Sequence, residues 1–270
     1  MTTPHSFSTP DPVDLEVRNP VGTIEVTATD TDTSTVQVTP LNGTDSAEAA
    51  DRVRVELSAD HRRLLVAAPE KRIVFGRGAR LAITVTVPTG SRLRARAASA
   101  DLTCSGQLAA VESHTASGDV SLDEVTGGTD VHAASGRVRI GSAGAVSVRT
   151  ASGDIRVERA GGDVDVHSAS GRVHVGLAEA SVRVHTASGD VAVDEAVRGA
   201  VDLTAAAGDL RVGVRSGVVA RLDLNTVSGR VRSELPVQDA PPEGGPTLVI
   251  RSRTMSGNVQ IGPAAADARS

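Results

Sequence analysis

Residues 115–119 read Thr-Ala-Ser-Gly-Asp, and variants of this phrase return at 133–137, 150–154, 168–172 and 186–190. The serines of the five phrases lie 18, 17, 18 and 18 residues apart. A nearly constant period of this length is typical of a solenoid, in which each repeat forms one coil of a continuous stack. Looser phrases at 207–209, 228–230 and 256–258 follow at wider spacings, which indicates that loops lengthen toward the C-terminus.

Each repeat has the residue pattern of two short strands. After Gly118, the apolar residues Val120 and Leu122 alternate with polar ones, and a second alternating run follows the Gly127-Gly128 loop. A period of two places the apolar side chains on one side of each strand. Stacked coils would bury these side chains in a shared core. We therefore predict an all-β fold, a parallel β-solenoid of the β-helix or β-roll type with about 18 residues per coil.

The Ser-Gly pairs mark the predicted corners of the coils. Glycine adopts positive φ angles without a steric penalty, and its missing side chain lets neighbouring coils approach closely. The predicted structural turn residues are Ser117, Gly118, Ser135, Gly136, Ser152, Gly153, Ser170, Gly171, Ser188 and Gly189. The residue after each glycine alternates between Asp and Arg from Asp119 to Asp190. Opposite charges on adjacent coils would support the stacking order, and the alternative is a solvated surface whose charges alternate by chance.

Composition shifts divide the chain into four segments. Residues 1–12 contain three prolines and no periodicity, so we expect a flexible lead-in. Residues 13–95 carry short alternating runs broken by Pro and Gly, which predict an irregular β region that continues or caps the solenoid. Residues 96–262 hold the regular repeats, with a proline-rich loop at 236–246. Residues 263–270 are expected to form a disordered tail.

The composition favours a narrow apolar core and a reducing environment. The chain has 270 residues, no Trp or Tyr and two Phe, so Val, Ala, Leu and Ile must fill the core. Its single cysteine, Cys104, excludes an internal disulfide and is expected to be buried. There is no apolar run of 18 residues and no secretory signal pattern at the N-terminus. We therefore expect no transmembrane segment and a cytoplasmic location.

The repeat resembles the bacterial DUF4097 family of β-strand-repeat proteins. The resemblance rests on Ser-Gly-Asp/Arg followed by Val-x-Val, on the runs at 13–17 and 22–26, and on Val-Thr-Val-Pro-Thr-Gly-Ser at 85–91. It covers roughly residues 7–262. It implies a β-solenoid with an adhesin-like role, since members carry the label of adhesin because of their shape. It brings no catalytic residue to this chain.

A block of arginines precedes the regular repeats. Arg92, Arg94 and Arg96 alternate with apolar residues, so a strand would place all three on one face. With Arg77 and Arg80, they are the candidate partner-binding residues for an unidentified macromolecule such as an acidic protein. The net charge of −5 and the lack of stacking aromatics argue against nucleic acid. The alternative is intramolecular, with the acidic N-terminal segment covering the block.

Four histidines occupy equivalent positions in the predicted coils. His114, His132, His167 and His185 should form an outward column that Arg149 interrupts. Neighbouring imidazoles make these histidines weak candidates for a metal site or a pH sensor, but no Cys or carboxylate completes an obvious set of ligands. We therefore predict a solvated His/Arg face, no metal and no cofactor.

Carboxylates also recur at matching positions. Asp119, Asp154 and Asp190 lie on alternate predicted coils, about 10 Å apart by the strand spacing, which approaches the separation in an inverting glycosidase. The arginines offered to them and the absence of an aromatic platform for a sugar favour a structural role. We therefore predict no catalytic residue and a chain that is not an enzyme.

These observations lead to three hypotheses for function. The first is a non-enzymatic, adhesin-like module whose repeated surface binds a macromolecule. The second is a cytoplasmic scaffold that self-associates end to end or by edge contact, in the manner of bactofilins, because an uncapped coil exposes strand edges suited to pairing. The third is a carbohydrate-active β-helix enzyme.

Overall fold

The computed structural model describes residues 4–69, 79–235 and 247–264. The chain divides into two compact units, residues 1–137 and 138–270. The first unit contains β1 (His5–Ser8), β2 (Asp14–Thr29), β3 (Thr33–Pro40), α1 (Gly43–Ala50), β4 (Arg54–Leu57), β5 (Arg63–Ala67), β6 (Leu81–Pro88), β7 (Arg92–Leu108), β8 (Ala110–Ser117) and β9 (Val120–Ser135).

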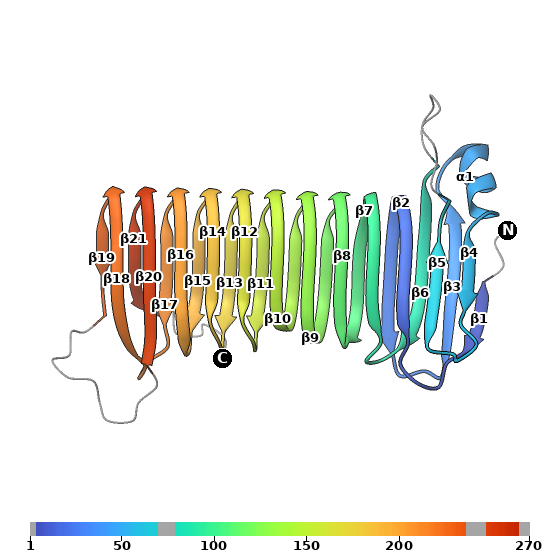
Figure 1. Ribbon diagram of the computed structural model, residues 1–270, viewed down its shortest axis with the longest axis horizontal. Coiled ribbons are helices and arrows are strands. Elements are labelled where there is room, and N and C mark those ends of the chain that lie inside the picture. The colour runs from blue at the N-terminus through green and yellow to red at the C-terminus, as the bar shows by residue number, and fades with distance from the viewer. Residues whose placement is uncertain (1–3, 70–78, 236–246, 265–270) are drawn as a thin grey trace, which may run out of the picture. The chain divides into compact units, whose positions relative to one another are not determined.

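The second unit consists of strands alone among its described residues (Figure 1). They are β10 (Val138–Ser152), β11 (Ile155–Ala160), β12 (Val164–Ser170), β13 (Val173–Ala178), β14 (Val182–Ser188), β15 (Val191–Ala196), β16 (Gly199–Ala207), β17 (Leu210–Val214), β18 (Val219–Ser228), β19 (Val231–Ser233), β20 (Thr247–Ser256) and β21 (Val259–Pro263). The predicted all-β class is confirmed.

The coils of the first unit stack in an order that differs from the order of the sequence. β2 pairs in parallel with β7 along both halves, from Asp14↔Arg92 to Thr27↔Ser105. On its other side, β2 pairs in parallel with β5 and β6. The coil formed by β2 therefore lies between β5–β6 and β7, and β8 and β9 continue the stack beyond β7. The N-terminal region is thus part of the solenoid.

Antiparallel strands flank the β5–β6 coil. β4 pairs with β5, β3 pairs with β6, and β1 pairs with β3, all in antiparallel fashion. α1 connects β3 to β4. His5–Ser8 therefore differs from the flexible lead-in predicted for residues 1–12, because hydrogen bonding to β3 holds it in place. The N-terminal region both begins the stack and covers its edge.

The second unit repeats one coil plan. On one sheet, Val146, Val164, Val182 and Val201 follow one another in register through β10, β12, β14 and β16. On the other sheet, β10, β11, β13, β15 and β17 pair in the same parallel manner. The order then departs from the sequence: β20 and β21 pair with β16 and β17, and β18 and β19 lie outside them. The predicted parallel β-solenoid is confirmed.

A thin aliphatic core runs inside each unit. In inner coils the inward valines are almost completely buried, as Val166, Val175 and Val184 show with 0% exposure. Cys104 on β7 belongs to this core, and burial raises the pKa of its thiol to about 12. Within the described part of the chain, no helix has the length and apolarity needed to cross a membrane. The predicted loop at 236–246 and most of the predicted tail lie outside the described residues.

Candidate interaction surfaces

The glycine corners are formed by backbone packed on backbone. Gly136, Gly171 and Gly189 have φ angles of 121°, 117° and 139°, a region that side chains disfavour. A Cβ added at Gly189 would lie 2.0 Å from the carbonyl oxygen of Gly171. Gly118 lacks a positive φ, but a Cβ there would lie 2.2 Å from the oxygen of Ala100. The corners therefore leave no room for a side chain.

The predicted turn serines end the strands that lead into these corners. They are stacked in register within each unit: Ser117 on Ser135 in the first unit, and Ser152 on Ser170 and Ser170 on Ser188 in the second. Gly153, like the other corner glycines with positive φ, follows its serine at φ 131°. The serine and glycine columns are structural features of the coil and offer no obvious ligand site.

The carboxylates after the corners bind the next coil. Asp119 accepts hydrogen bonds from the backbone N–H of Arg137 at 2.9 Å and from its guanidinium at 2.6 Å. Asp154 makes the same two contacts with Arg172, each at 3.0 Å. Asp190 accepts the backbone N–H of Asp209 at 2.9 Å, a bond that offsets part of the repulsion between two acidic neighbours. The three carboxylates of the enzyme hypothesis are therefore each hydrogen-bonded to the neighbouring coil.

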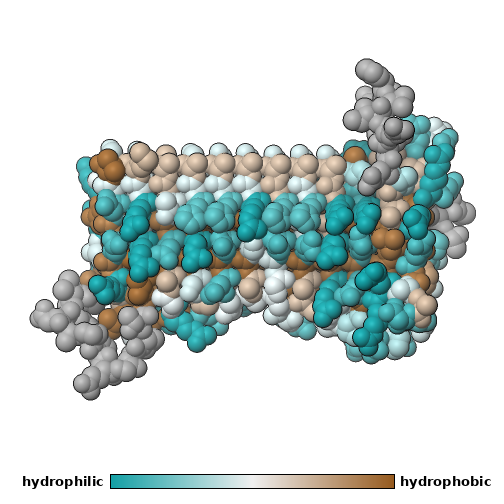
Figure 2. Space-filling model, viewed as in Figure 1, coloured by the Kyte–Doolittle hydropathy of each residue, from teal (hydrophilic) through white to brown (hydrophobic). Residues whose placement is uncertain are grey.

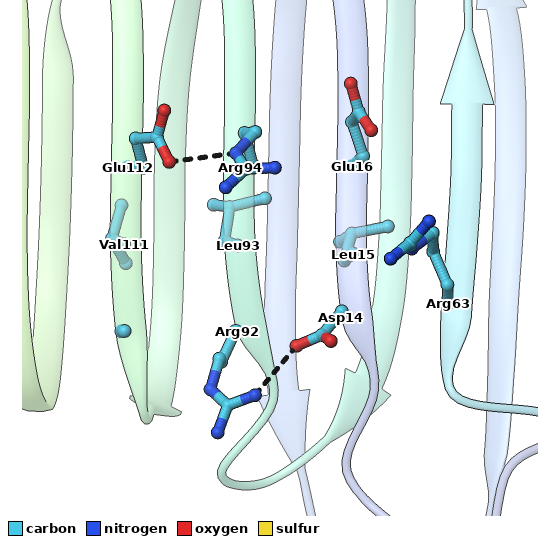
Figure 3. A pocket seen from close by; sticks show the side chains of 10 residues that line it. Asp14, Leu15, Glu16, Arg63, Arg92, Leu93, Arg94, Val111 and Glu112 are labelled. Carbon is cyan, nitrogen blue, oxygen red and sulfur yellow. Dashed lines mark hydrogen bonds and ion pairs between the residues drawn. The ribbon is translucent and has the colours of Figure 1, made fainter.

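The arginine block lies in a charge-balanced surface of the first unit. Arg92 donates to Asp14 of β2 at 3.2 Å, and Arg94 donates to Glu112 of β8 at 2.8 Å. Figure 3 shows both pairs at the rim of a depression that Glu16 and Arg63 also line. Three carboxylates and three guanidinium groups therefore share this surface. Arg92 therefore pairs with the acidic N-terminal segment, as in the intramolecular alternative, whereas Arg94 pairs with Glu112, which lies outside that segment.

The pairing of Arg94 with Glu112 shifts the pKa of both groups. The hydrogen bond from Arg94 holds the pKa of Glu112 below its ordinary value, with a further contribution from His114. The bond to Glu112 in turn raises the pKa of Arg94. Both groups remain charged at neutral pH, so the pair is already formed before any partner arrives.

Arg96 follows Arg94 on the same exposed face of β7. It pairs in register with Arg18 on β2, and within residues 4–69, 79–235 and 247–264 its side chain makes no hydrogen bond or ion pair. Arg80 precedes β6, which pairs with the other half of β2. Arg77 lies outside the described residues. Among the described members of the block, Arg92, Arg94 and Arg96 share one face of β7, and Arg80 lies just before β6.

The histidines form two short outward stacks. In the first unit, the rings of His114 and His132 have centroids 4.9 Å apart, and in the second unit those of His167 and His185 are 5.1 Å apart. His114 contacts Glu112 at 3.1 Å and His167 contacts Asp165 at 3.1 Å, so a carboxylate two residues earlier in the sequence faces these two rings. Figure 2 shows rows of hydrophilic side chains that run along the stacked coils. Among the described residues, no three His, Cys, Asp or Glu are grouped to hold a metal ion.

A row of basic side chains crosses the opposite sheet of the second unit. The row runs in register through β10, β11, β13, β15, β17, β21 and β19, and its residues are Arg139, Arg156, His174, Ala192, Arg211, Gln260 and Arg232. We call its basic members, Arg139, Arg156, His174, Arg211 and Arg232, the cationic ladder. Neighbouring strands are about 4.8 Å apart, and Ala192 and Gln260 interrupt the ladder.

Three carboxylates on this sheet are already paired. Glu158 is ion-paired with Arg156, Asp194 contacts His174 at 2.8 Å, and Glu195 is ion-paired with Arg215. Glu234, two residues after Arg232, is exposed. The side chains of Arg139, Arg211 and Arg232 are exposed and make no hydrogen bond or ion pair with the described part of the chain. These three guanidinium groups therefore carry positive charge that no carboxylate of the described residues pairs.

A comparison with protein families assigns the chain to a known family. Residues 14–262 match the family described as Toastrack DUF4097. The chain belongs to the Toastrack DUF4097 family. The match confirms the predicted resemblance and covers both units, from the first residue of β2 almost to the end of β21. A search of curated proteins finds no match.

Three of the solved structures similar to this Toastrack chain bear the name putative adhesin. A "putative adhesin" from Parabacteroides distasonis shares 16% identity over 97% of each chain, with a TM-score of 0.46. Another from Parabacteroides merdae shares 13% identity over 96% of this chain and 95% of that chain, with a TM-score of 0.44. A third from Bacteroides fragilis shares 15% identity over 97% of each chain, with a TM-score of 0.39. The family assignment rests on the sequence match.

Sequence reasoning did not predict the cationic ladder of the Toastrack chain. Its signal was present, because Arg139, Arg156 and His174 each stand three residues after a corner glycine. The search for clustered basic residues favoured 92–96 instead, where the arginines are close in sequence. In a solenoid, residues one coil apart are the spatial neighbours, so charge must be counted down the columns.

Proposed function

We propose that this Toastrack chain is a non-enzymatic binding module that presents the cationic ladder to an acidic protein partner. The observation that carries the proposal is the set of three exposed arginines, Arg139, Arg211 and Arg232, in one register row, whose side chains form no ion pair with the described part of the chain. Uncompensated charge on a flat surface attracts an oppositely charged partner and orients it on approach.

The shape of the surface supports this role. The row following the ladder contains the glycines Gly141, Gly176 and Gly213, which leave little side-chain volume, together with the carboxylates Glu158, Asp194 and Glu234. The glycine positions leave space for an extended acidic segment to approach the exposed arginines. By contrast, Arg92 and Arg94 of the first unit would have to exchange existing ion pairs for new ones.

The test compares two triple variants with the same net charge. The ladder variant carries Arg139→Ser, Arg211→Ser and Arg232→Ser. The control carries Arg18→Ser, Arg92→Ser and Arg94→Ser, which removes arginines already paired with Glu16, Asp14 and Glu112. The probe is a fluorescent oligoglutamate peptide, and its binding is followed by anisotropy at low and physiological salt.

We expect the ladder variant to lose roughly tenfold in affinity, about 1.4 kcal/mol, if each exposed guanidinium contributes about 0.5 kcal/mol. The control should lose less than about threefold, and binding by the unmodified chain should weaken as salt rises. Equal losses in the two variants would show attraction by net charge alone, and no loss in the ladder variant would remove the ladder from consideration. Either result contradicts the proposal.

A further inference from the structure

The outermost coil of the second unit has an open edge. β18 pairs with β20 on one side, and β19 pairs with β21 on one side; no other described strand adjoins either of them in this unit. β18 is ten residues long, so one row of its N–H and C=O groups lacks a strand partner among the described residues. An edge of this length is a template for pairing with another strand.

The core is also open at this coil. The inward positions of β18 and β19 are occupied by Leu222, Leu224 and Val231. Their register partners in the adjacent coil include Ile250 and Val259, both 0% exposed, whereas Leu222 and Leu224 are only half-buried and Val231 is 47% exposed. The apolar stripe therefore continues into this coil without a covering layer in the described structure.

The charges beside Leu222 suit a second copy of the same strand. Arg221 and Asp223 flank Leu222 and both are exposed, and Asp223 is also ion-paired with Arg253 of β20 at 3.4 Å. In an antiparallel pair centred on Leu222, each Arg221 would stand opposite Asp223 of the other copy, and the two Leu222 side chains would meet in the core. Centring the pair one residue either way would instead place Arg221 opposite Arg221 or Asp223 opposite Asp223, and like charges opposite each other are destabilising.

We propose that β18 pairs antiparallel with β18 of a second copy of this chain, about a two-fold axis at Leu222, to form a closed dimer. Residues 219–225 would then form a continuous ladder across the dimer, with Ala220 facing Leu224 of the other copy. An isologous contact of this kind uses up the edge on both copies, so it ends assembly at two chains.

The edges of the first unit do not offer an equivalent surface. β4 and β1 have four residues each, and both run antiparallel to the strands that they cover. Short edge strands of this kind oppose pairing. A head-to-tail chain would therefore rest on a much shorter ladder than the symmetric pair of β18 strands. This difference distinguishes the proposed dimer from an open-ended scaffold.

Charge reversal gives a sharp test by sedimentation velocity over a wide range of protein concentration. The unmodified full chain should shift from monomer to dimer and go no further. Arg221→Asp and Asp223→Arg should each raise the dissociation constant at least about tenfold, because each places like charges opposite one another. An equimolar mixture of the two variants should recover the dimer, since both pairs are then complementary.

A cysteine scan tests the register independently. Under mild oxidation, Leu222→Cys should cross-link two chains, because residue 222 faces itself across the axis. Leu224→Cys should not, because it faces Ala220, and the native Cys104 is buried and does not interfere. A monomer at every concentration, assemblies that grow beyond two chains, no recovery in the mixture, or equal cross-linking at 222 and 224 would each overturn the proposal.

Discussion

The edge strands of the two units cover the apolar core to different extents. In the first unit, β4 is short and antiparallel, and it borders β5, where Leu64 and Val66 are 0% exposed. In the second unit, β18 is long and parallel to its neighbour, and its Leu222 and Leu224 are only half-buried. A parallel coil cannot bury its own apolar row. It depends on a further coil or on strands of another direction to cover it.

The comparison predicts that inner coils tolerate far less change than the open edge. We expect Gly189→Ala to cost more than about 3 kcal/mol, because it adds a strained backbone angle to a clash with the oxygen of Gly171. Gly217→Ala, in the turn before β18, should cost about 1–2 kcal/mol, because its φ is 82° but nothing lies within 4 Å of the added Cβ. Urea unfolding measures both, and similar losses would contradict this difference.

A second pair of variants compares the two edges directly. Leu64→Ala should destabilise the chain by about 2–5 kcal/mol, since the side chain is fully buried beside β4. Leu222→Ala should cost about 1 kcal/mol or less when the protein is dilute enough to be monomeric, because the half-exposed side chain has less burial to lose. A rise in the cost of Leu222→Ala at high concentration would link the open edge to the dimer. Equal costs for both variants in dilute solution would show that the open edge is covered.

The smallest expected effect concerns the ion pair between Arg94 and Glu112 in the first unit. Because Arg94 lowers the folded-state pKa of Glu112, their pair contributes stability above the unfolded pKa of about 4.3 and loses it as pH falls through the lower folded value. Glu112→Gln should therefore weaken the chain slightly at pH 7 and hardly at all near pH 3. Thermal unfolding at the two pH values measures this. Glu25→Gln is the control. The side chain of Glu25 is exposed and makes no hydrogen bond or ion pair in the described structure, so this variant should show no such difference between the two pH values.

Sequence reasoning succeeded for residues that lie one coil length apart in the sequence, because such residues are neighbours in adjacent coils. The corner glycines, the inward valines and the Asp119–Arg137 pair follow from one coil length. The contact between Arg94 and Glu112 spans the same 18 residues but was not predicted. The contact between Arg92 and Asp14 spans 78 residues and depends on β2 stacking next to β7. No period in the sequence indicates that neighbour, so the intramolecular alternative could name the acidic N-terminal segment but not Asp14.

The sequence by itself determined the coil: two short strands, an aliphatic interior and a glycine corner, because side-chain alternation and backbone sterics act within a few residues. Only the tertiary structure decided the order of the coils and the character of the edges. β2 lies between β5–β6 and β7, and β18–β19 lies outside β20–β21. Coils with the same apolar row can pair with one another in many orders, so loop connections and flanking strands select one order, and that order leaves β18 at the edge of the second unit.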